Sequence, residues 1–265
     1  MKKIKKGVEP DELTAYRTKH PDAKWEEMRH DGIDNGAAAA KACLRTCIEQ
    51  QGNVCAYCEC SITIQSPQYC RVEHIHPKSD SSKDANWNLD WSNMVGTCAG
   101  ITAQQARKVF PHPSNMSCDA YKNHLIQKKK IGADCENILL NPLSIPEFPP
   151  LFDINKFSGE LVPHRDCNTV TIEKNHFSTT EELVKNTIDV LNLNCDRLCT
   201  ERLNVLEKIE KQIQKARKEG KKPQDFMPKL ATYYFKTQWP QYFTTIRCRL
   251  GKYAESYLQS VDFQG

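Results

Sequence analysis

Residues 55–78 read CAYCECSITIQSPQYCRVEHIHPK, and this stretch decides which fold the sequence predicts. Cys55 and Cys58 are separated by two residues, the spacing at which two thiolates in one tight turn bind a single tetrahedral ion. The run YCRVEHI alternates between apolar and polar residues and contains β-branched residues, which favour strands, and the shorter run ITI is similar. Pro77 comes just beyond and predicts that the second strand ends there.

A second pair of cysteines is needed to complete a four-thiolate site, and Cys98 and Cys118 are the candidates. Cys98 follows NMVGT (93–97), a predicted partner strand, and Cys118 opens a predicted helix, CDAYKNHLIQKKK. Residues 99–117 lie between them, so this insertion must loop out for its two ends to meet at one ion. The alternative ligands for this pair are Cys60, Cys70 and Cys135. Four thiolates leave no open position for a catalytic water, which predicts a structural zinc ion.

The composition supports a globular, reduced protein. The hydrophobic fraction is 39% and the charged fraction 26%, and the net charge of +4 permits a polyanionic partner without demanding one. The opening MKKIKKG is too charged to start a signal peptide, and no apolar run reaches the length of a membrane span. We therefore expect a cytoplasmic protein that makes no use of a membrane, in which the 13 cysteines stay reduced.

The predicted fold class is α+β: a small zinc-stabilised core with a mainly helical N-terminal arm and C-terminal half. Alanine-rich residues 37–51 predict one helix, and residues 196–218, which stop before Gly220, predict a longer one. The sequence from Ser178 to Glu181 predicts a capping box. The predicted parts are an arm (1–36), a core (37–135), a connector with a hairpin turn at KFSGEL (136–177) and a helical region (178–265).

Glu73 and His74 stand together at the predicted strand end, where they suit phosphodiester hydrolysis. Histidine is the side chain whose pKa suits a general base near neutral pH, and a carboxylate is a hard ligand for Mg²⁺ or Mn²⁺. Asp119, directly after Cys118, offers a second carboxylate to the same ion. Asn93 can either accept a hydrogen bond from the imidazole or hold the connecting loop. The expected catalytic residues are therefore His74, Asn93, Glu73 and Asp119.

Three further side chains are candidates for contact with nucleic acid. Lys122 lies three residues after Asp119, on nearly the same helix face, where its ammonium can meet a phosphate. Lys78 follows the Glu-His pair and is a similar candidate. His76 is open to three interpretations: a phosphate contact, an auxiliary metal ligand or a loop residue.

The order CAYC, then EHIHPKS, then Asn93, then Cys118-Asp119 and Lys122 resembles the HNH, or ββα-metal, nuclease superfamily. The resemblance implies that His74 is the general base, Asn93 the middle residue of the motif, and Glu73 and Asp119 the ligands of one catalytic divalent ion. Asn or His usually follows the last cysteine in that superfamily, so Asp119 is a departure from its pattern.

The resemblance extends to scattered blocks over most of the chain: MKKIKKGVEPDEL, EQQGNVCAYCE, VEHIHPKS, CDAYK and TIDVLNLNCDRLCTER. Together these are similar to the PtuB family, the HNH components of the Septu anti-phage defence system, which also occur beside some retrons. The resemblance implies a DNA substrate, with RNA as an alternative, and a PtuA-like ABC ATPase as a partner. It also implies, more remotely, a retron reverse transcriptase with its multicopy single-stranded DNA.

Two other functions remain open at the level of the sequence. A ribonuclease toxin that acts on RNA such as tRNA would use the same site, because substrate choice depends on the surrounding surfaces. A non-catalytic zinc module that only binds nucleic acid or scaffolds a complex would explain the cysteines. It would leave Glu73, His74, Asn93 and Asp119 without a role, and a His74→Ala variant distinguishes it from a nuclease.

Overall fold

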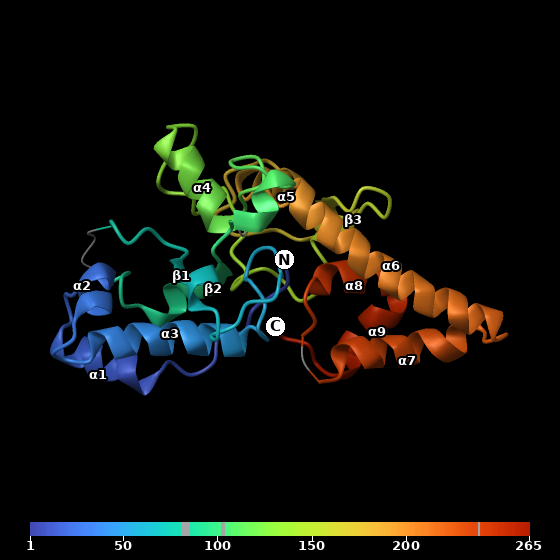
Figure 1. Ribbon diagram of the computed structural model, residues 1–265, viewed down its shortest axis with the longest axis horizontal. Helices are drawn as coiled ribbons and strands as arrows, with labels where there is room; N and C mark the ends of the chain where they lie inside the picture. The colour runs from blue at the N-terminus through green and yellow to red at the C-terminus, as the bar shows by residue number, and fades with distance from the viewer. Residues whose placement is uncertain (81–84, 102–103, 238) are drawn as a thin grey trace.

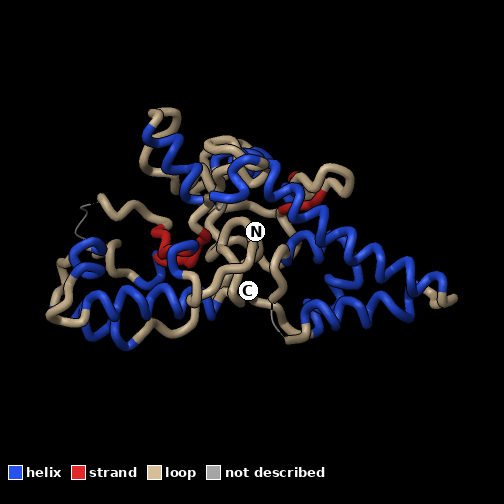
Figure 2. Tube along the Cα trace, viewed as in Figure 1, coloured by secondary structure: helices blue, strands red, loops and turns tan. Residues whose placement is uncertain are grey.

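The computed structural model describes residues 1–80, 85–101, 104–237 and 239–265, and within them the fold is α+β (Figure 1). In the first half the elements are α1 (Asp11–Lys19), α2 (Trp25–His30), α3 (Gly36–Gln50), β1 (Cys70–His74), β2 (Met94–Cys98) and α4 (Cys118–Gln127). In the second half they are β3 (Phe152–Ile154), β4 (Leu161–Pro163), α5 (Thr180–Val190), α6 (Asp196–Lys218), α7 (Pro223–Phe235), α8 (Phe243–Leu250) and α9 (Lys252–Ser260). Helices α1–α3 form one end of an elongated molecule and α6–α9 the other, and α4, α5, the short strands and most long loops lie between them (Figure 2).

The N-terminal helices α1 and α2 pack on α3 rather than extending away from it. Leu13 and Met28 are fully buried, and they share one apolar cluster with Ala39 and Cys43 on the inner face of α3. The helices approach closely because α3 starts with a glycine: a Cβ at Gly36 would lie 2.4 Å from the backbone oxygen of Met28. The predicted helix at 37–51 is confirmed with a shift of one residue.

Strands β1 and β2 form an antiparallel pair, as the sequence predicts, with Cys70 opposite Cys98 and His74 opposite Met94. Gln51, just after α3, fixes the pair to the preceding helix: its side-chain amide accepts from Gly96 N at 2.7 Å and donates to Gly96 O at 2.8 Å. The shorter run ITI was wrongly predicted as a strand. Residues 62–64 form no strand, and the isolated bridge nearby joins Val54 to Ser61, just before them.

The hairpin predicted in the connector is present as β3 and β4. Phe152, Ile154 and Leu161 bury their side chains, so that even these three-residue strands contribute to the core. Arg202 of α6 is 1% exposed and ties the hairpin to the C-terminal helices, because it donates to the backbone oxygen of Gly159 at 3.1 Å.

The C-terminal half is helical, as expected. Helix α6 spans the predicted residues 196–218 and turns one side, Leu198, Leu206 and Ile209 among others, toward the core. The capping box of α5 lies one residue later than predicted: Thr179 accepts from Glu182 N, and Glu182 accepts from Thr179 N. Ser178, Thr179 and Thr180 can all cap a helix, and the prediction chose Ser178. The structure uses Thr179, which places Thr180 and Leu183 on the buried face of α5.

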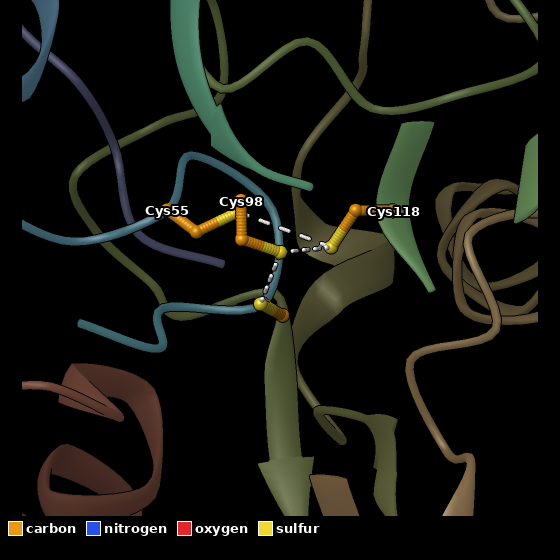
Figure 3. Close-up of side chains that lie close together, drawn as sticks. Cys55, Cys98 and Cys118 are labelled. Carbon is orange, nitrogen blue, oxygen red and sulfur yellow. Dashed lines mark hydrogen bonds between the residues drawn. The ribbon is translucent and has the colours of Figure 1, made fainter. Parts of the chain in front are cut away.

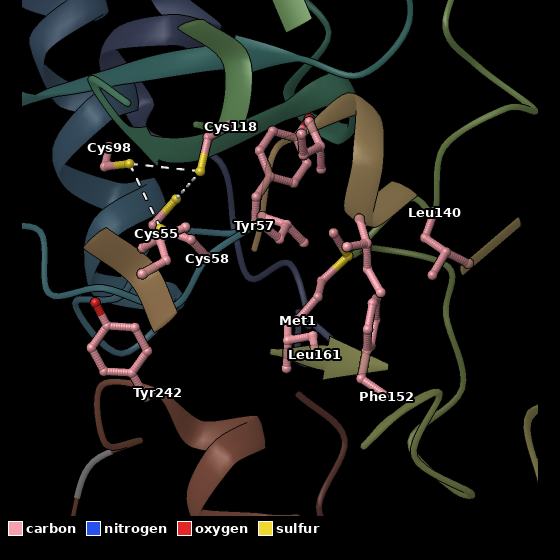
Figure 4. Packing of buried hydrophobic residues seen from close by; sticks show 14 of the residues in the cluster. Met1, Cys55, Tyr57, Cys58, Cys98, Cys118, Leu140, Phe152, Leu161 and Tyr242 are labelled. Carbon is pink, nitrogen blue, oxygen red and sulfur yellow. Dashed lines mark hydrogen bonds between the residues drawn. The ribbon is translucent and has the colours of Figure 1, made fainter. Parts of the chain in front are cut away.

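One large apolar cluster joins the middle of the molecule to its C-terminal half (Figure 4). It contains Cys55, Cys58, Cys98 and Cys118 together with residues from the hairpin, α5 and the loop before α8, such as Phe152, Leu183 and Tyr242. The four cysteines therefore lie at a junction of several elements. In the described ranges, no helix has both the length and the apolar composition needed to cross a membrane.

Candidate active site and four-cysteine site

The four cysteines predicted as zinc ligands converge in space. Cys55 and Cys58 come from the turn after α3, Cys98 ends β2 and Cys118 opens α4 (Figure 3). The sulfur atoms of Cys55 and Cys118 are 3.9 Å apart, and those of Cys58 and Cys98 and of Cys98 and Cys118 are both 3.7 Å apart. All four side chains are buried, and their sulfurs lie within 4.8 Å of one another.

This geometry fits a tetrahedral zinc ion. Zinc–sulfur bonds of about 2.3 Å in a regular tetrahedron place neighbouring sulfurs about 3.8 Å apart, which is close to the distances observed here. Zinc binds thiolates rather than thiols. Contact with the Cys118 thiol lowers the pKa of Cys98 to about 6, whereas contact with Cys55 raises the pKa of Cys118 well above its ordinary value. The site would hold a structural ion, because four sulfurs fill its coordination sphere.

The two ends of the 99–117 insertion meet through a glycine. Ser117 N donates to Gly100 O at 2.8 Å, and Gly100 has φ +64°. A Cβ at Gly100 would lie 2.0 Å from Ser117 O, so only glycine allows this approach. Cys118 N also donates to Leu191 O at 2.8 Å, which fixes the returning end to the segment before α6. These contacts bring Cys98 and Cys118 together.

Three of the predicted catalytic residues, Glu73, His74 and Asp119, line a cavity of about 640 Å³ between the N-terminal helices and α4, and Asn93 does not. Glu73 and His74 reach it from the end of β1, and Asp119 and Lys122 reach it from α4. Neighbours on a strand face opposite sides. The two residues share one cavity because β1 ends at His74, as the proline beyond it predicts.

Two buried carboxylates form the acidic part of this cavity. Glu73 is 8% exposed and Asp119 is 4% exposed, and Lys122 pairs with both: its Nζ contacts Glu73 and lies 3.5 Å from Asp119 Oδ1. Arg71 Nη1 lies 3.2 Å from Asp119 Oδ2, and Asn123 Nδ2 donates to Asp119 Oδ1 at 2.8 Å. Two carboxylates fit a hard divalent ion such as Mg²⁺, which keeps several of its waters.

The charges in this group affect one another. Burial raises the pKa of Glu73 to about 8, against the opposing effect of the Lys122 ammonium. Burial also acts to lower the pKa of Lys122, but the charges of Glu73 and Asp119 outweigh it, and that pKa is raised. A cation is therefore needed beside these carboxylates, and Lys122 supplies one. The sequence analysis placed Lys122 against a phosphate, whereas its ammonium faces the carboxylates.

His74 is held as a neutral imidazole with a defined tautomer. Burial, reinforced by the charge of Lys78, lowers the pKa of His74 to about 4. Its Nε2–H donates to the backbone oxygen of Asn88 at 3.1 Å, which leaves the lone pair on Nδ1. The ring of Trp25 meets the imidazole edge-on, with 5.0 Å between ring centroids. A neutral, oriented imidazole is the form that can accept a proton.

Asn93 holds the loop after β1, one of the two roles expected for it. Its Oδ1 accepts from His76 N at 2.6 Å, and its Nδ2 donates to His76 O at 3.1 Å and to Trp87 O at 2.9 Å. These three bonds use both N–H groups of the amide and one lone pair of its oxygen, and none of them goes to the imidazole, so Asn93 orients His74 through the backbone. Asn93 is 4% exposed.

Of the three interpretations of His76, the geometry matches a loop residue. Nδ1 lies 2.8 Å from Glu136 Oε2, Nε2 lies 2.7 Å from Asp80 Oδ2, and the ring packs on Trp87 at 4.1 Å. Both ring nitrogens are thereby occupied. Lys78 is at the edge of the cavity, where its Nζ lies 3.4 Å from Glu26 Oε1.

Sequence reasoning missed four residues around this cavity. Arg71 and Asn123 were within reach of it, since Arg71 shares a strand face with Glu73 and Asn123 lies one helical turn beyond Asp119. Trp25 and Asn88 gave no local signal. Trp25 belongs to the arm and reaches His74 only because α2 packs against this side of the core.

The antiparallel pair β1–β2 and helix α4 place a Glu-His pair and an Asp around one cavity, beside four converging cysteines, an arrangement that could bind metal ions. Comparison with known proteins gives the family. The chain is 35% identical over 209 residues, 78% of its length, to the Escherichia coli protein named "Retron Ec83 putative HNH endonuclease", of which it covers 79%. No family model matches the sequence. With that identity and coverage, the chain belongs to the HNH endonuclease family.

Proposed function

We propose that this protein is a metal-dependent endonuclease that hydrolyses phosphodiester bonds of nucleic acid. The observation that carries the proposal is the placement of a neutral imidazole, whose Nδ1 has no hydrogen-bond partner among the described residues, in the same cavity as two carboxylates. The retron protein named above supports the same chemistry, because it is named as a putative HNH endonuclease.

The proposed mechanism assigns each group one task. His74 accepts the proton of the attacking water at Nδ1, while its Nε2–H stays bonded to Asn88 O. Glu73 and Asp119 would hold the divalent ion, Mg²⁺ or Mn²⁺. When bound, such an ion stabilises the charge that develops on the phosphate and on the leaving oxygen. In-line attack with departure of the 3′ oxygen gives 5′-phosphate and 3′-hydroxyl ends.

The surrounding residues prepare this reaction. Asn93 fixes the loop that follows the base, and Trp25 excludes water from one side of the imidazole. Basic side chains at the cavity, Lys78 and Arg29 among them, would bind the phosphates beside the one that is cut. The four cysteines would hold a zinc ion that fixes the end of β2 beside the start of α4.

The proposal extends to a defence role in a retron or Septu system, as a PtuB-like effector controlled by a PtuA-like ABC ATPase. Regulation by a partner would explain how a cell tolerates the nuclease. The retron name of the E. coli relative supports this association. Purification of the tagged chain from cells that carry the complete system should recover the ATPase, and recovery of the chain alone would contradict the partner assignment.

The central test is cleavage by the purified protein, with and without its ATPase, in Mg²⁺ or Mn²⁺. Plasmid DNA, single-stranded DNA and tRNA are offered in parallel. Wild-type protein should cut at least one of them, and His74→Ala should lower the single-turnover rate by about 10²–10⁴-fold. His176→Ala, which changes an exposed histidine outside the cavity, serves as the matched control and should cut normally.

The outcome also separates the rival functions. Cutting of tRNA alone would favour the ribonuclease toxin. Binding of nucleic acid without cutting, by wild type and His74→Ala alike, would favour a non-catalytic zinc module and would contradict the nuclease proposal.

A further inference from the structure

Arg197, in the first turn of α6, has a buried guanidinium that is incompletely paired. Its Nη2 donates to Ser117 Oγ at 2.9 Å, and its Nη1 lies 3.5 Å from Glu201 Oε1. Its Nε is buried and finds no hydrogen-bond partner within the described part of the chain. The side chain is 12% exposed. A buried N–H without an acceptor is costly, so this donor calls for a partner.

The surroundings of Arg197 point to the four-cysteine site. Ser117, its hydrogen-bond partner, directly precedes Cys118. Cys195 and Leu198, on either side of Arg197 in the sequence, belong to the same buried cluster as the four cysteines. Burial acts to lower the pKa of Arg197, but negative charge on Cys58, Cys195, Glu201 and Cys98 outweighs it, and the pKa is raised.

The backbone near Arg197 is also fixed to the segment that carries Cys118. Arg197 N donates to Asn115 Oδ1 at 2.9 Å, and Asn115 is fully buried. Asn192 Nδ2 donates to Met116 O at 2.7 Å, and Cys118 N donates to Leu191 O at 2.8 Å. The start of α6 therefore holds Arg197 in a set position beside the last of the four cysteines.

A four-thiolate zinc centre needs such a cation. Four thiolates and one Zn²⁺ carry a net charge of −2, and a buried net charge is stable only with compensation and hydrogen bonds. Arg202, the other arginine on this side of α6, already donates to Leu193 O, Gly159 O and Asn194 Oδ1. Of this pair, Arg197 is the arginine with a buried nitrogen that lacks a hydrogen-bond partner among the described residues.

We propose that Arg197 is a positioning residue of the four-cysteine site: with zinc bound, its charge would offset the excess negative charge of the centre, and its Nε–H, unpaired among the described residues, would be available to a cysteine sulfur. The inference rests on the zinc site proposed above. The C-terminal half would then take a direct part in metal retention. Helix α6 would supply Arg197 as a partner of the cysteine sulfurs, whereas the four cysteines themselves come from residues 55–118. Loss of outer-sphere partners typically weakens metal binding by about 10–100-fold.

The test measures zinc retention by the full chain. Zinc content per chain is determined by elemental analysis, and the rate of zinc release is followed with a chromogenic chelator. Arg197→Met should release zinc about 10–100-fold faster than wild type, and Arg197→Lys, which keeps the charge but loses Nε–H, should lie between them. Arg165→Met, at an arginine whose side chain is 88% exposed, is the matched control.

Cobalt substitution adds a readout that a merely structural role would not move. The sulfur-to-cobalt charge-transfer band should shift in Arg197→Met, because a hydrogen bond to sulfur lowers the energy of its lone pair, and Arg165→Met should leave the band unchanged. If Arg197→Met does not accumulate as folded protein, Arg197→Lys and Arg197→Gln carry both measurements.

The outcomes separate the two proposals. Wild-type protein without zinc would overturn the zinc site itself. Wild-type protein with one zinc per chain, together with Arg197 variants that match the control in release rate and charge-transfer band, would overturn only the role of Arg197.

Discussion

His74 donates a hydrogen bond from Nε2 to the backbone oxygen of Asn88 at 3.1 Å, and this bond determines which ring nitrogen can act as a base. The side chain of Asn88 holds the same corner together: its Oδ1 accepts from Trp25 N at 3.2 Å, and its Nδ2 donates to Lys78 O at 3.1 Å. A segment of the N-terminal arm and a loop 63 residues later are thus joined around one imidazole.

Replacement of Trp25 tests whether this packing positions the base. Trp25→Phe keeps an aromatic edge against the imidazole, whereas Trp25→Leu removes it. We expect Trp25→Leu to cut nucleic acid about 10-fold more slowly than Trp25→Phe in single turnover, since misplacement of a reacting group by about 1 Å can cost up to 10²-fold. Substrate affinity should change little in both.

The control for this comparison is a tryptophan far from the cavity. Trp239 packs against the apolar cluster of α7, α8 and α9, which includes Phe235, Phe243 and Leu258. Trp239→Leu should therefore lower the thermal midpoint without a specific loss of rate. A rate loss in Trp239→Leu as large as that in Trp25→Leu would show that general destabilisation, rather than misplacement of His74, explains the effect.

Lys122 is expected to compete with a divalent ion for Glu73 and Asp119. Lys122→Met removes the cation between two buried acidic groups, which should cost about 3–5 kcal/mol of unfolding free energy in metal-free buffer above pH 8, where Glu73 is ionised in the wild type. Mn²⁺ should restore that stability, and it should raise the thermal midpoint of Lys122→Met more than that of wild type.

Thermal unfolding over a Mn²⁺ titration checks this expectation, with Lys128→Met on the exposed end of α4 as the matched control. Equal responses of wild type and Lys122→Met to Mn²⁺ would mean that Lys122 and the ion do not share these carboxylates.

Local sequence patterns predicted the parts of this fold that depend on local physics. The strand pair, the connector hairpin and α6 follow from alternation, turn chemistry and helical periodicity. The convergence of Cys98 with Cys118 was also predictable, because a metal site restricts which distant cysteines can meet, even across the 99–117 insertion.

The remaining features depend on contacts that no short pattern encodes. Trp25 reaches His74 through the packing of α2. Lys122 turns toward two carboxylates because buried acidic groups require a neighbouring cation more than an exposed phosphate contact does. A run of three candidate caps, Ser178 to Thr180, also left the start of α5 ambiguous by one residue until its buried face was known.

Removal of one zinc ligand should have a much larger effect than removal of a cysteine elsewhere. Cys118→Ala leaves three thiolates in a buried site and should reduce bound zinc well below one per chain, with loss of cooperative folding, since a structural zinc site contributes directly to stability. Cys199→Ala, outside the group, is the matched control. Elemental analysis and thermal unfolding give the two readouts, and a Cys118→Ala protein that folds and binds zinc normally would refute the assignment.

His76 predicts a pH dependence of stability. Burial is the largest single effect and opposes the charged form, but the hydrogen bonds to Glu136 and Asp80, together with the charges of these carboxylates, outweigh it and raise the pKa of His76. A raised pKa in the folded state means that the imidazolium adds stability fully below the ordinary value of about 6.5 and that this contribution is lost as the pH rises through the folded-state pKa. Urea unfolding of wild type and His76→Gln, measured from pH 5 to 9, should therefore show a difference that is largest at low pH and shrinks above neutrality. A difference that stays constant or grows with pH would mean that His76 holds Glu136 and Asp80 as a neutral ring.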